Sequence, residues 1–123
     1  MITSHRNSET GIIESKYEGR ITLQDIISYI SELKDIGKYP KKILILSDAT
    51  EGRLELVADD EKVFATLIRQ YAPHYDMIKD AVIISDPKST AYSLLFRSAA
   101  ASIPNYQMEL FNTREAAIRW LLG

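Results

Sequence analysis

Two aspartates stand where an open α/β sheet commonly binds its ligands. Asp48 follows the unbroken apolar run of residues 43–46, Asp86 follows a second run at residues 81–84, and a serine precedes each aspartate. If the two runs are neighbouring parallel strands, both carboxylates lie at one carboxyl edge of the sheet. A pair of carboxylates placed in this way could hold a hard cation or act as acid and base.

The same aspartates also suit local backbone roles, and we favour those roles. Asp86 precedes Pro87, and an aspartate before proline is a typical helix start in which the carboxylate caps the first turn. Asp48 is expected to accept hydrogen bonds in a turn where its strand ends. No third carboxylate has a fixed spacing to the pair, so we predict no metal site.

Other catalytic patterns are missing from the sequence. His5 and His74 share no motif, no serine lies in a Gly-x-Ser-x-Gly elbow, and the five glycines are scattered singly, without a phosphate-binding pattern. The absence of cysteine excludes disulfides, thiolate metal sites and cysteine nucleophiles. We therefore expect a protein that is not an enzyme and that uses no cofactor.

Aromatic side chains gather near the ends of two predicted helices and in the loops that follow. Rings with one wet end suit the rim of a pocket or a membrane interface. Burial in the core is the more common role of such aromatic residues. Arg53 and Arg97 could bind an anionic headgroup, but arginines of this kind are more often simply exposed to solvent. The aromatic group consists of Tyr71, Tyr75, Tyr92, Phe96 and Tyr106.

A β-hairpin is expected at the beginning of the chain. Residues 2–6 and 12–17 have the composition of strands, and residues 7–11 between them are turn formers. Residues 18–20, Glu-Gly-Arg, are expected to form a turn after the second strand.

The first predicted helix follows that turn. Thr22 is expected to cap it, and Asp25 lies near the positive end of the helix dipole. Apolar residues then recur at helical spacing until Gly37 and Pro40, which are expected to end the helix.

The two apolar runs lack polar alternation, which is typical of strands covered on both faces. The connection after the first run, residues 49–56, is longer than most strand-to-helix loops. A second helix is expected from Ala58 or Asp59 to Pro73, and a third begins at Asp86.

A last strand at residues 107–111 and a terminal helix, opened by the capping sequence at residues 112–115, complete the chain. The predicted order is ββαβαβαβα within a single domain over residues 1–123. We expect an α/β fold with a mostly parallel five-stranded sheet, helices on both faces, and the first strand antiparallel at or near an edge.

The composition is that of an ordinary soluble globular protein, with 46% apolar and 26% charged residues. A net charge of -2 without a block of like charge argues against a nucleic-acid partner. The amino terminus lacks the apolar core of a signal peptide, and no apolar run is long enough to span a membrane. We expect a cytoplasmic protein.

The order of these elements resembles the SpoIIAA-like family, which is related to STAS domains and to the CRAL-TRIO lipid-carrier fold. The most specific matching stretches are residues 80–87, Asp-Ala-Val-Ile-Ile-Ser-Asp-Pro, and residues 115–122, Glu-Ala-Ala-Ile-Arg-Trp-Leu-Leu. The resemblance implies a small α/β sandwich without known enzymatic chemistry. It also implies one of two roles, a partner-switching regulator or a protein that binds apolar ligands or membrane surfaces.

One departure from the STAS pattern concerns regulation. Regulatory STAS proteins carry Asp-Ser-Ser-Gly or Asp-Ser-Thr-Gly after the first central strand, and the first serine accepts phosphate. Here the stretch is Asp48-Ala49-Thr50-Glu51, so alanine occupies the acceptor position. A phosphate beside Asp48 and Glu51 would also be repelled. Regulation by phosphorylation is therefore disfavoured.

These observations favour a binding module for an apolar or amphipathic small molecule, such as a lipid, or for a membrane surface. The alternative is a regulator that binds a protein partner and lacks the usual phosphoacceptor serine. The predicted site lies between the second and third helices near the Ser47–Asp48 edge. Its candidate ligand-binding residues are Asp48, Thr50, Arg53, Tyr71, Asp86, Tyr92 and Phe96.

Overall fold

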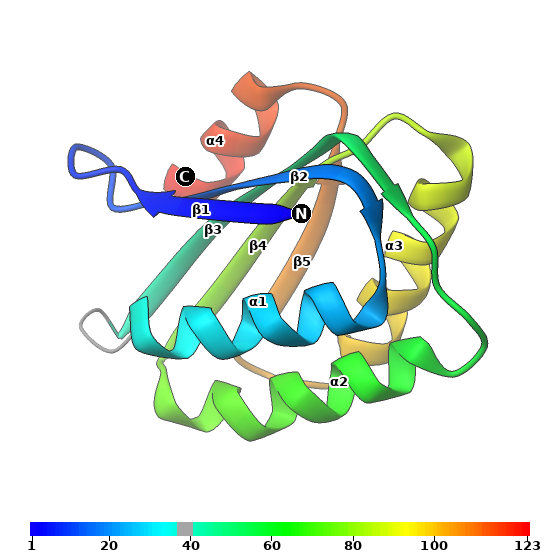
Figure 1. The fold of residues 1–123 in the computed structure, drawn as a ribbon. Coiled ribbons are helices and arrows are strands. Elements are labelled where there is room, and N and C mark those ends of the chain that lie inside the picture. The colour runs from blue at the N-terminus through cyan, green and yellow to red at the C-terminus, as the bar shows by residue number, and fades with distance from the viewer. Residues whose placement is uncertain (37–40) are drawn as a thin grey trace.

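The computed structural model describes residues 1–36 and 41–123. Over this part of the chain, five strands and four α-helices follow the predicted order (Figure 1). The predicted helix end at Gly37 and Pro40 lies outside the described residues. The strands are β1 (Ile2–Arg6), β2 (Ile13–Ile21), β3 (Lys42–Leu54), β4 (Met77–Ile83) and β5 (Tyr106–Phe111), and the helices are α1 (Leu23–Ile36), α2 (Asp60–Tyr71), α3 (Pro87–Ala100) and α4 (Arg114–Leu122).

The sheet keeps the order of the chain from one edge to the other, β1-β2-β3-β4-β5. β1 and β2 form an antiparallel hairpin, and every later pair is parallel. The mostly parallel five-stranded sheet, with its first strand antiparallel at an edge, is therefore confirmed. β3 and β4 are parallel neighbours, as the two apolar runs predicted.

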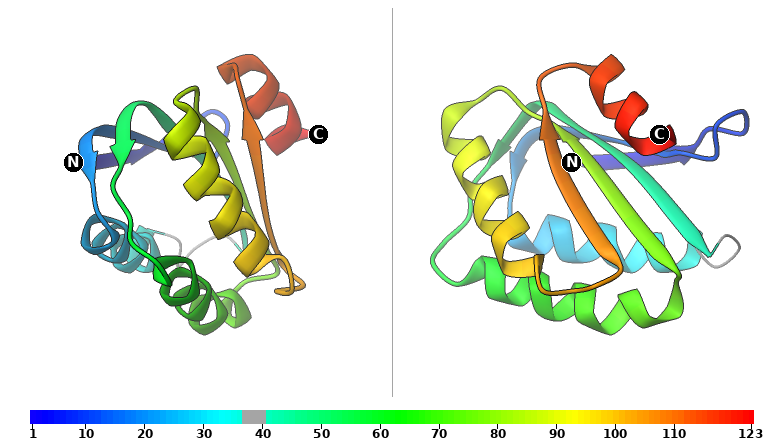
Figure 2. Two further views of the ribbon diagram at one scale, coloured as in Figure 1. Left: turned by 90° about the vertical axis from the view of Figure 1, so that its right-hand side faces the viewer. Right: turned by 180° about the vertical axis from the view of Figure 1, so that it is seen from behind.

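Three helices cover one face of the sheet and α4 covers the other (Figure 2). Each crossover through α1, α2 and α3 moves the chain by one strand in the same direction, so crossovers of one hand place all three helices on one side. Alternate residues of β3 then divide between two cores. Ile43 and Ile45 pack beneath α1 to α3, and Leu44 and Leu46 pack against α4.

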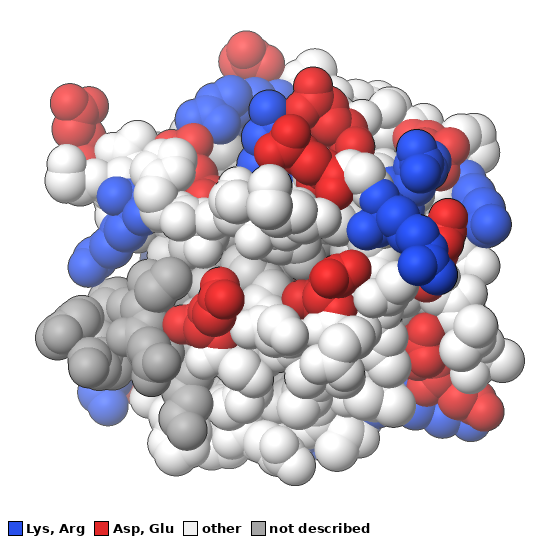
Figure 3. All heavy atoms as spheres, in the orientation of Figure 1, with Lys and Arg blue, Asp and Glu red and all other residues white. Residues whose placement is uncertain are grey.

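Charged side chains are unevenly distributed over the face covered by α1 and α2. Figure 3 shows acidic side chains over α1 and a largely uncharged surface over α2. Among the described side chains of α1, both charged ones, Asp25 and Glu32, are acidic. No helix in the described ranges has the length and apolar composition needed to cross a membrane.

β3 is longer than the sequence predicts. Instead of ending at Asp48 and giving way to a loop over residues 49–56, the strand continues to Leu54. Its second half pairs with the second half of β2, which includes residues 18–20. The predicted loop and the predicted turn are therefore wrong. Glycine and charged residues favour turns locally, and here pairing between the two strands overrides that preference.

A β-bulge lies where β2 and β3 bend together. Tyr17 of β2 faces two residues of β3, Ala49 and Thr50. The side chain of Asp48 stabilises the bulge, because it accepts hydrogen bonds from the Thr50 backbone N–H at 3.0 Å and from the Thr50 hydroxyl at 2.6 Å. Gly52 then lies directly against Tyr17, where an added Cβ would come within 3.0 Å of the Tyr17 Cβ.

Side chains at the helix starts act as the sequence predicts. At α1, the Thr22 hydroxyl oxygen accepts a hydrogen bond from the Asp25 backbone N–H at 3.4 Å, and the Asp25 carboxylate accepts one in return from the Thr22 backbone N–H at 2.8 Å. Asp86 accepts a hydrogen bond from the backbone N–H three residues later, at 2.8 Å, and so caps α3. At α4 the cap is Thr113, one residue after the first residue of the predicted capping sequence, and its hydroxyl accepts a hydrogen bond from the Ala116 backbone N–H at 3.2 Å. These bonds supply acceptors to N–H groups that the helices leave free.

We predict that Gly52→Ala destabilises the protein by about 1–3 kcal/mol, because the new methyl group must displace Tyr17 or its backbone. Urea unfolding followed by circular dichroism measures this change. Arg53→Ala, an exposed neighbour in the same strand, is the matched control and should shift the midpoint much less. Equal midpoints for the two variants would contradict the prediction.

Candidate ligand-binding site

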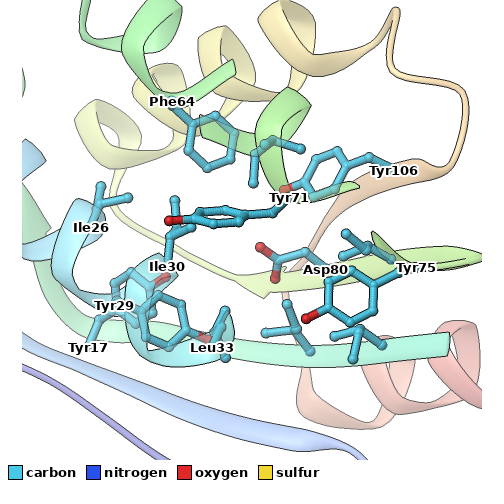
Figure 4. Close-up of a pocket in the computed structure, with 14 residues that line it drawn as sticks. Tyr17, Ile26, Tyr29, Ile30, Leu33, Phe64, Tyr71, Tyr75, Asp80 and Tyr106 are labelled. Carbon is cyan, nitrogen blue, oxygen red and sulfur yellow. The ribbon is translucent and has the colours of Figure 1, made fainter. Parts of the chain in front are cut away.

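A half-open cavity lies between α1, α2 and the sheet (Figure 4). Its volume is about 70 Å³, and apolar and aromatic side chains form most of its wall. β2, β3, β4 and β5 supply the floor. The lining residues are Tyr17, Ile26, Tyr29, Ile30, Leu33, Ile43, Ile45, Phe64, Ile68, Tyr71, Tyr75, Ile78, Asp80 and Tyr106.

Asp80 is the carboxylate of this cavity. It lies on β4 between Ile78 and Val82 and shares their inward-facing side of the strand, with 9% of its surface exposed. The Ser47 hydroxyl donates a hydrogen bond to Asp80 Oδ1 at 2.8 Å. Within residues 1–36 and 41–123, Ser47 is its only hydrogen-bond partner, and Figure 4 shows the carboxyl group pointing into the cavity. One carboxyl oxygen is therefore available to a ligand.

Burial raises the pKa of the Asp80 carboxyl group to about 6, and the hydrogen bond from Ser47 opposes part of this rise. The cause is the loss of water around the charged form. Burial also raises the pKa values of the Tyr17, Tyr29 and Tyr106 hydroxyls, and the negative charge of Asp80 adds to that effect. These tyrosines are neutral at physiological pH, whereas Asp80 changes its charge close to it.

A strip of polar groups leads from α1 to Asp80 beneath the apolar wall. The hydroxyl groups of Tyr29 and Ser15 are hydrogen-bonded. The Tyr29 ring packs edge-on against Tyr17, with centroids 5.9 Å apart and an interplanar angle of 72°. Ser15 and Ser47 are direct neighbours across β2 and β3, and Ser47 bonds to Asp80. The strip fixes the tyrosines and the carboxyl group relative to one another.

The aromatic residues predicted to bind a ligand divide between two places. Tyr71 lines the cavity, and so do Tyr75 and Tyr106 of the predicted aromatic group. Tyr92 and Phe96 lie on α3 and line a second groove, of about 290 Å³, near the start of α2. Phe96 also stacks on Phe64 with centroids 4.5 Å apart, and this contact packs α2 against α3. The cavity that contains Asp80 lies between α1 and α2 instead.

The predicted polar residues lie outside the cavity. Asp48 and Thr50 bond to each other at the β-bulge, Asp86 caps α3, and Arg53 is exposed on β3. Both aspartates thus have the local backbone roles favoured from the sequence, although Asp48 performs its role within a strand. In the described ranges, no group of three or more side chains could hold a metal ion. Ligand binding at these four residues stays a prediction.

Sequence reasoning missed Asp80, Ser47, Tyr17 and Tyr29 as site residues. Asp80 did carry a signal, because it shares the strand face of Ile78, and a carboxylate on an inward-facing position of a central strand needs an explanation. The contribution of Tyr17 has no comparable signal. It depends on the β-bulge and on pairing between strands that the local sequence does not specify.

The sequence model of the SpoIIAA-like family matches residues 12–122, which is nearly the whole chain. The chain belongs to the SpoIIAA-like family. This finding confirms the resemblance seen in the order of elements. No curated protein matches the sequence. Membership of the family therefore indicates the fold of this SpoIIAA-like protein but no specific activity.

A solved structure has the same architecture. It is an uncharacterized protein of the DUF3478 family, with a SpoIIAA-like fold, from Shewanella loihica PV-4. The two structures superpose with a TM-score of 0.63 at 18% sequence identity, over 98% of this chain and 92% of that one. At this identity the similarity shows the fold alone, so the function must be argued from the site.

We predict that Asp80→Asn removes a pH dependence from the stability of the protein. The wild-type carboxyl group has a pKa of about 6 when folded and about 3.9 when unfolded. Well below pH 4 the carboxyl group is protonated in both states. As the pH rises to 6 and beyond, the unfolded state ionises first, and the free energy of unfolding of the wild type falls by up to about 3 kcal/mol. The variant has no carboxyl group at this position and does not show this fall.

Urea unfolding of both proteins from pH 4 to pH 8 tests this prediction. The stability of the variant relative to the wild type should increase between pH 4 and pH 6 and then level off. Asp76→Asn, at an exposed position, serves as the control. A difference between the Asp80 variant and the wild type that stays constant with pH would contradict the raised pKa.

Proposed function

We propose that this SpoIIAA-like protein is a non-enzymatic binding module for a small amphipathic molecule held in the cavity between α1 and α2. The observation that carries the proposal is an apolar, aromatic cavity with a single carboxylate at its floor. Ligand sites in proteins are concave and mostly apolar, with a few polar groups that fix orientation. Asp80 and its bond to Ser47 supply that polar end.

The cavity volume limits the size of the ligand. An engineered apolar cavity of about 150 Å³ binds benzene, and this cavity has about half that volume. Its enclosed part therefore suits a group of three or four non-hydrogen atoms. A longer molecule would extend outward past Leu33, Tyr71 and Tyr75, the lining residues of α1, α2 and the following loop that are only partly buried.

The surroundings of Asp80 support binding over catalysis. A general acid or base works with a second group whose pKa differs from its own. In the described part of the chain, no histidine, lysine, arginine or second carboxylate lines the cavity. The groups nearest Asp80 are serine and tyrosine hydroxyls that stay neutral near pH 7.

A cytoplasmic location remains part of the proposal, as expected from the sequence.

A protein partner is a second candidate, supported by exposed apolar side chains on another surface. Val57, Leu94 and Leu95 are 72%, 46% and 50% exposed, and they lie on α3 and on the loop that leads into α2. Such a patch suits a partner protein better than solvent. Loss of a captured partner on Leu95→Glu, with no loss on Leu33→Trp, would favour this regulatory role over small-molecule binding.

We predict that Leu33→Trp weakens small-molecule binding at least about tenfold, because the indole ring fills the mouth of the cavity. The probe is 1-butanol, whose affinity for the wild type should be about millimolar given its five non-hydrogen atoms. Titration followed by amide chemical shifts measures the affinity, and the largest shifts should occur around Tyr71 and Tyr75.

Leu122→Trp is the matched control. It introduces the same side chain at an exposed position of α4, on the opposite face of the sheet, and should leave the affinity unchanged. A wild-type protein that shows no saturable shifts at the cavity would contradict the proposal. If the protein instead floats with liposomes and Leu33→Trp has no effect on flotation, the ligand is a membrane surface.

A further inference from the structure

We propose that the cavity selects a small primary amine, with the alkylammonium group against Asp80 and the carbon chain among the apolar side chains of α1 and α2. The inference rests on the binding function proposed above and adds the chemical class of the ligand. It is drawn from three features of the site: an available carboxylate oxygen, a surrounding group of aromatic rings, and the absence of a protein cation along the described wall.

The carboxylate oxygen is the first feature. The Ser47 hydroxyl donates a hydrogen bond to Asp80 Oδ1 at 2.8 Å, and no described residue bonds to the other carboxylate oxygen of Asp80. The carboxyl group points into the cavity (Figure 4). A buried carboxylate with a single neutral donor is poorly stabilised in its charged form. A ligand with a positive charge and N–H donors would pair with this oxygen and stabilise the charged form of Asp80.

The aromatic rings are the second feature. Five tyrosines and Phe64 contribute to the cavity wall, and Figure 4 shows rings on several sides of the Asp80 carboxyl group. The face of an aromatic ring attracts a cation within about 6 Å, and groups of such rings recognise ammonium ligands. Neutral hydrocarbon walls would suffice for an uncharged ligand, whereas rings combined with one carboxylate favour a cationic one.

The charges around the site are the third feature. The titratable groups that share the cavity with Asp80 are Tyr17 of β2, Tyr29 of α1, Tyr71 of α2, Tyr75 of the loop before β4, and Tyr106 of β5. Burial raises the pKa values of Tyr17, Tyr29, Tyr75 and Tyr106 further above the neutral range. In the described ranges no lysine, arginine or histidine lines the wall. Acidic side chains lie over α1 on the same face (Figure 3), and they favour the approach of a cation.

The amine and the carboxylate must both be charged for this contact. An alkylammonium group, like the lysine side chain, keeps its proton well above neutral pH. Asp80 loses its proton near pH 6. Binding of an amine should therefore weaken as the pH falls below 6, about tenfold at pH 5 relative to pH 7.5, because only about one-tenth of the free protein is then ionised at this residue.

The test compares n-butylamine with 1-butanol, which have the same carbon chain and differ in the charge of the polar end. At pH 7.5 we expect n-butylamine to bind the wild type at least about tenfold more tightly than 1-butanol. At pH 5 that advantage should be about tenfold smaller, with the 1-butanol affinity nearly constant. Asp80→Asn should abolish the preference for the amine at pH 7.5.

The outcomes separate this inference from the proposed function. If neither compound produces saturable chemical-shift changes at the cavity, both proposals fail. If 1-butanol binds as tightly as n-butylamine at pH 7.5, the binding module stands and the amine preference is overturned. Should Asp80→Asn not fold, the pH dependence of the wild type decides, and amine affinity that does not change between pH 7.5 and pH 5 overturns the inference.

Discussion

The hydrogen bond between Ser47 and Asp80 is the contact on which the structure of the site depends. It joins two central parallel strands beneath α1 and α2, in a layer that is mostly apolar and aromatic. A carboxyl group in such a layer is tolerated when it is protonated or when it is well paired. One neutral donor provides only part of that pairing. The protonation state of Asp80 therefore depends on what occupies the cavity next to it.

The topology explains why the space lies where it does. Because α1, α2 and α3 all cross on the same side, all three helices must pack side by side on one face of the sheet. α2 and α3 meet through the stacked rings of Phe64 and Phe96. Between α1 and α2 the floor is built from side chains of unequal length, including Asp80 beside isoleucines and tyrosines, and the packing there leaves a volume unfilled.

Much of the fold could be predicted because it depends on local patterns. The apolar runs that became β3 and β4, the caps Thr22 and Asp86, and the spacing of the helices are each visible within a few residues. The second half of β3 could not be predicted in that way. Residues 51–54 remain extended only because β2 pairs with them, and Gly52 makes the close approach to Tyr17 sterically acceptable.

The candidate site was harder to predict for the same reason. The sequence drew attention to Asp48 and Asp86, whose carboxylates are occupied by neighbouring N–H groups. The available carboxylate belongs to Asp80, and its setting is formed by residues from β2, α1, α2 and β5, which are far apart in the chain. Of the seven candidate ligand-binding residues only Tyr71 lines the cavity, together with Tyr75 and Tyr106 of the predicted aromatic group. The position of an aromatic side chain at a helix end says little about which neighbouring helix it faces.

The agreement between strand order and chain order has a consequence for how the molecule assembles. Each new strand joins the edge left by the one before it, so the sheet can grow from the hairpin toward β5 without inserting a strand between two that are already paired. Loop closure then involves one crossover at a time, which keeps the entropic barrier of each step small. Growth in this direction matches the order in which a ribosome releases the chain, and α4 can seal the second face last.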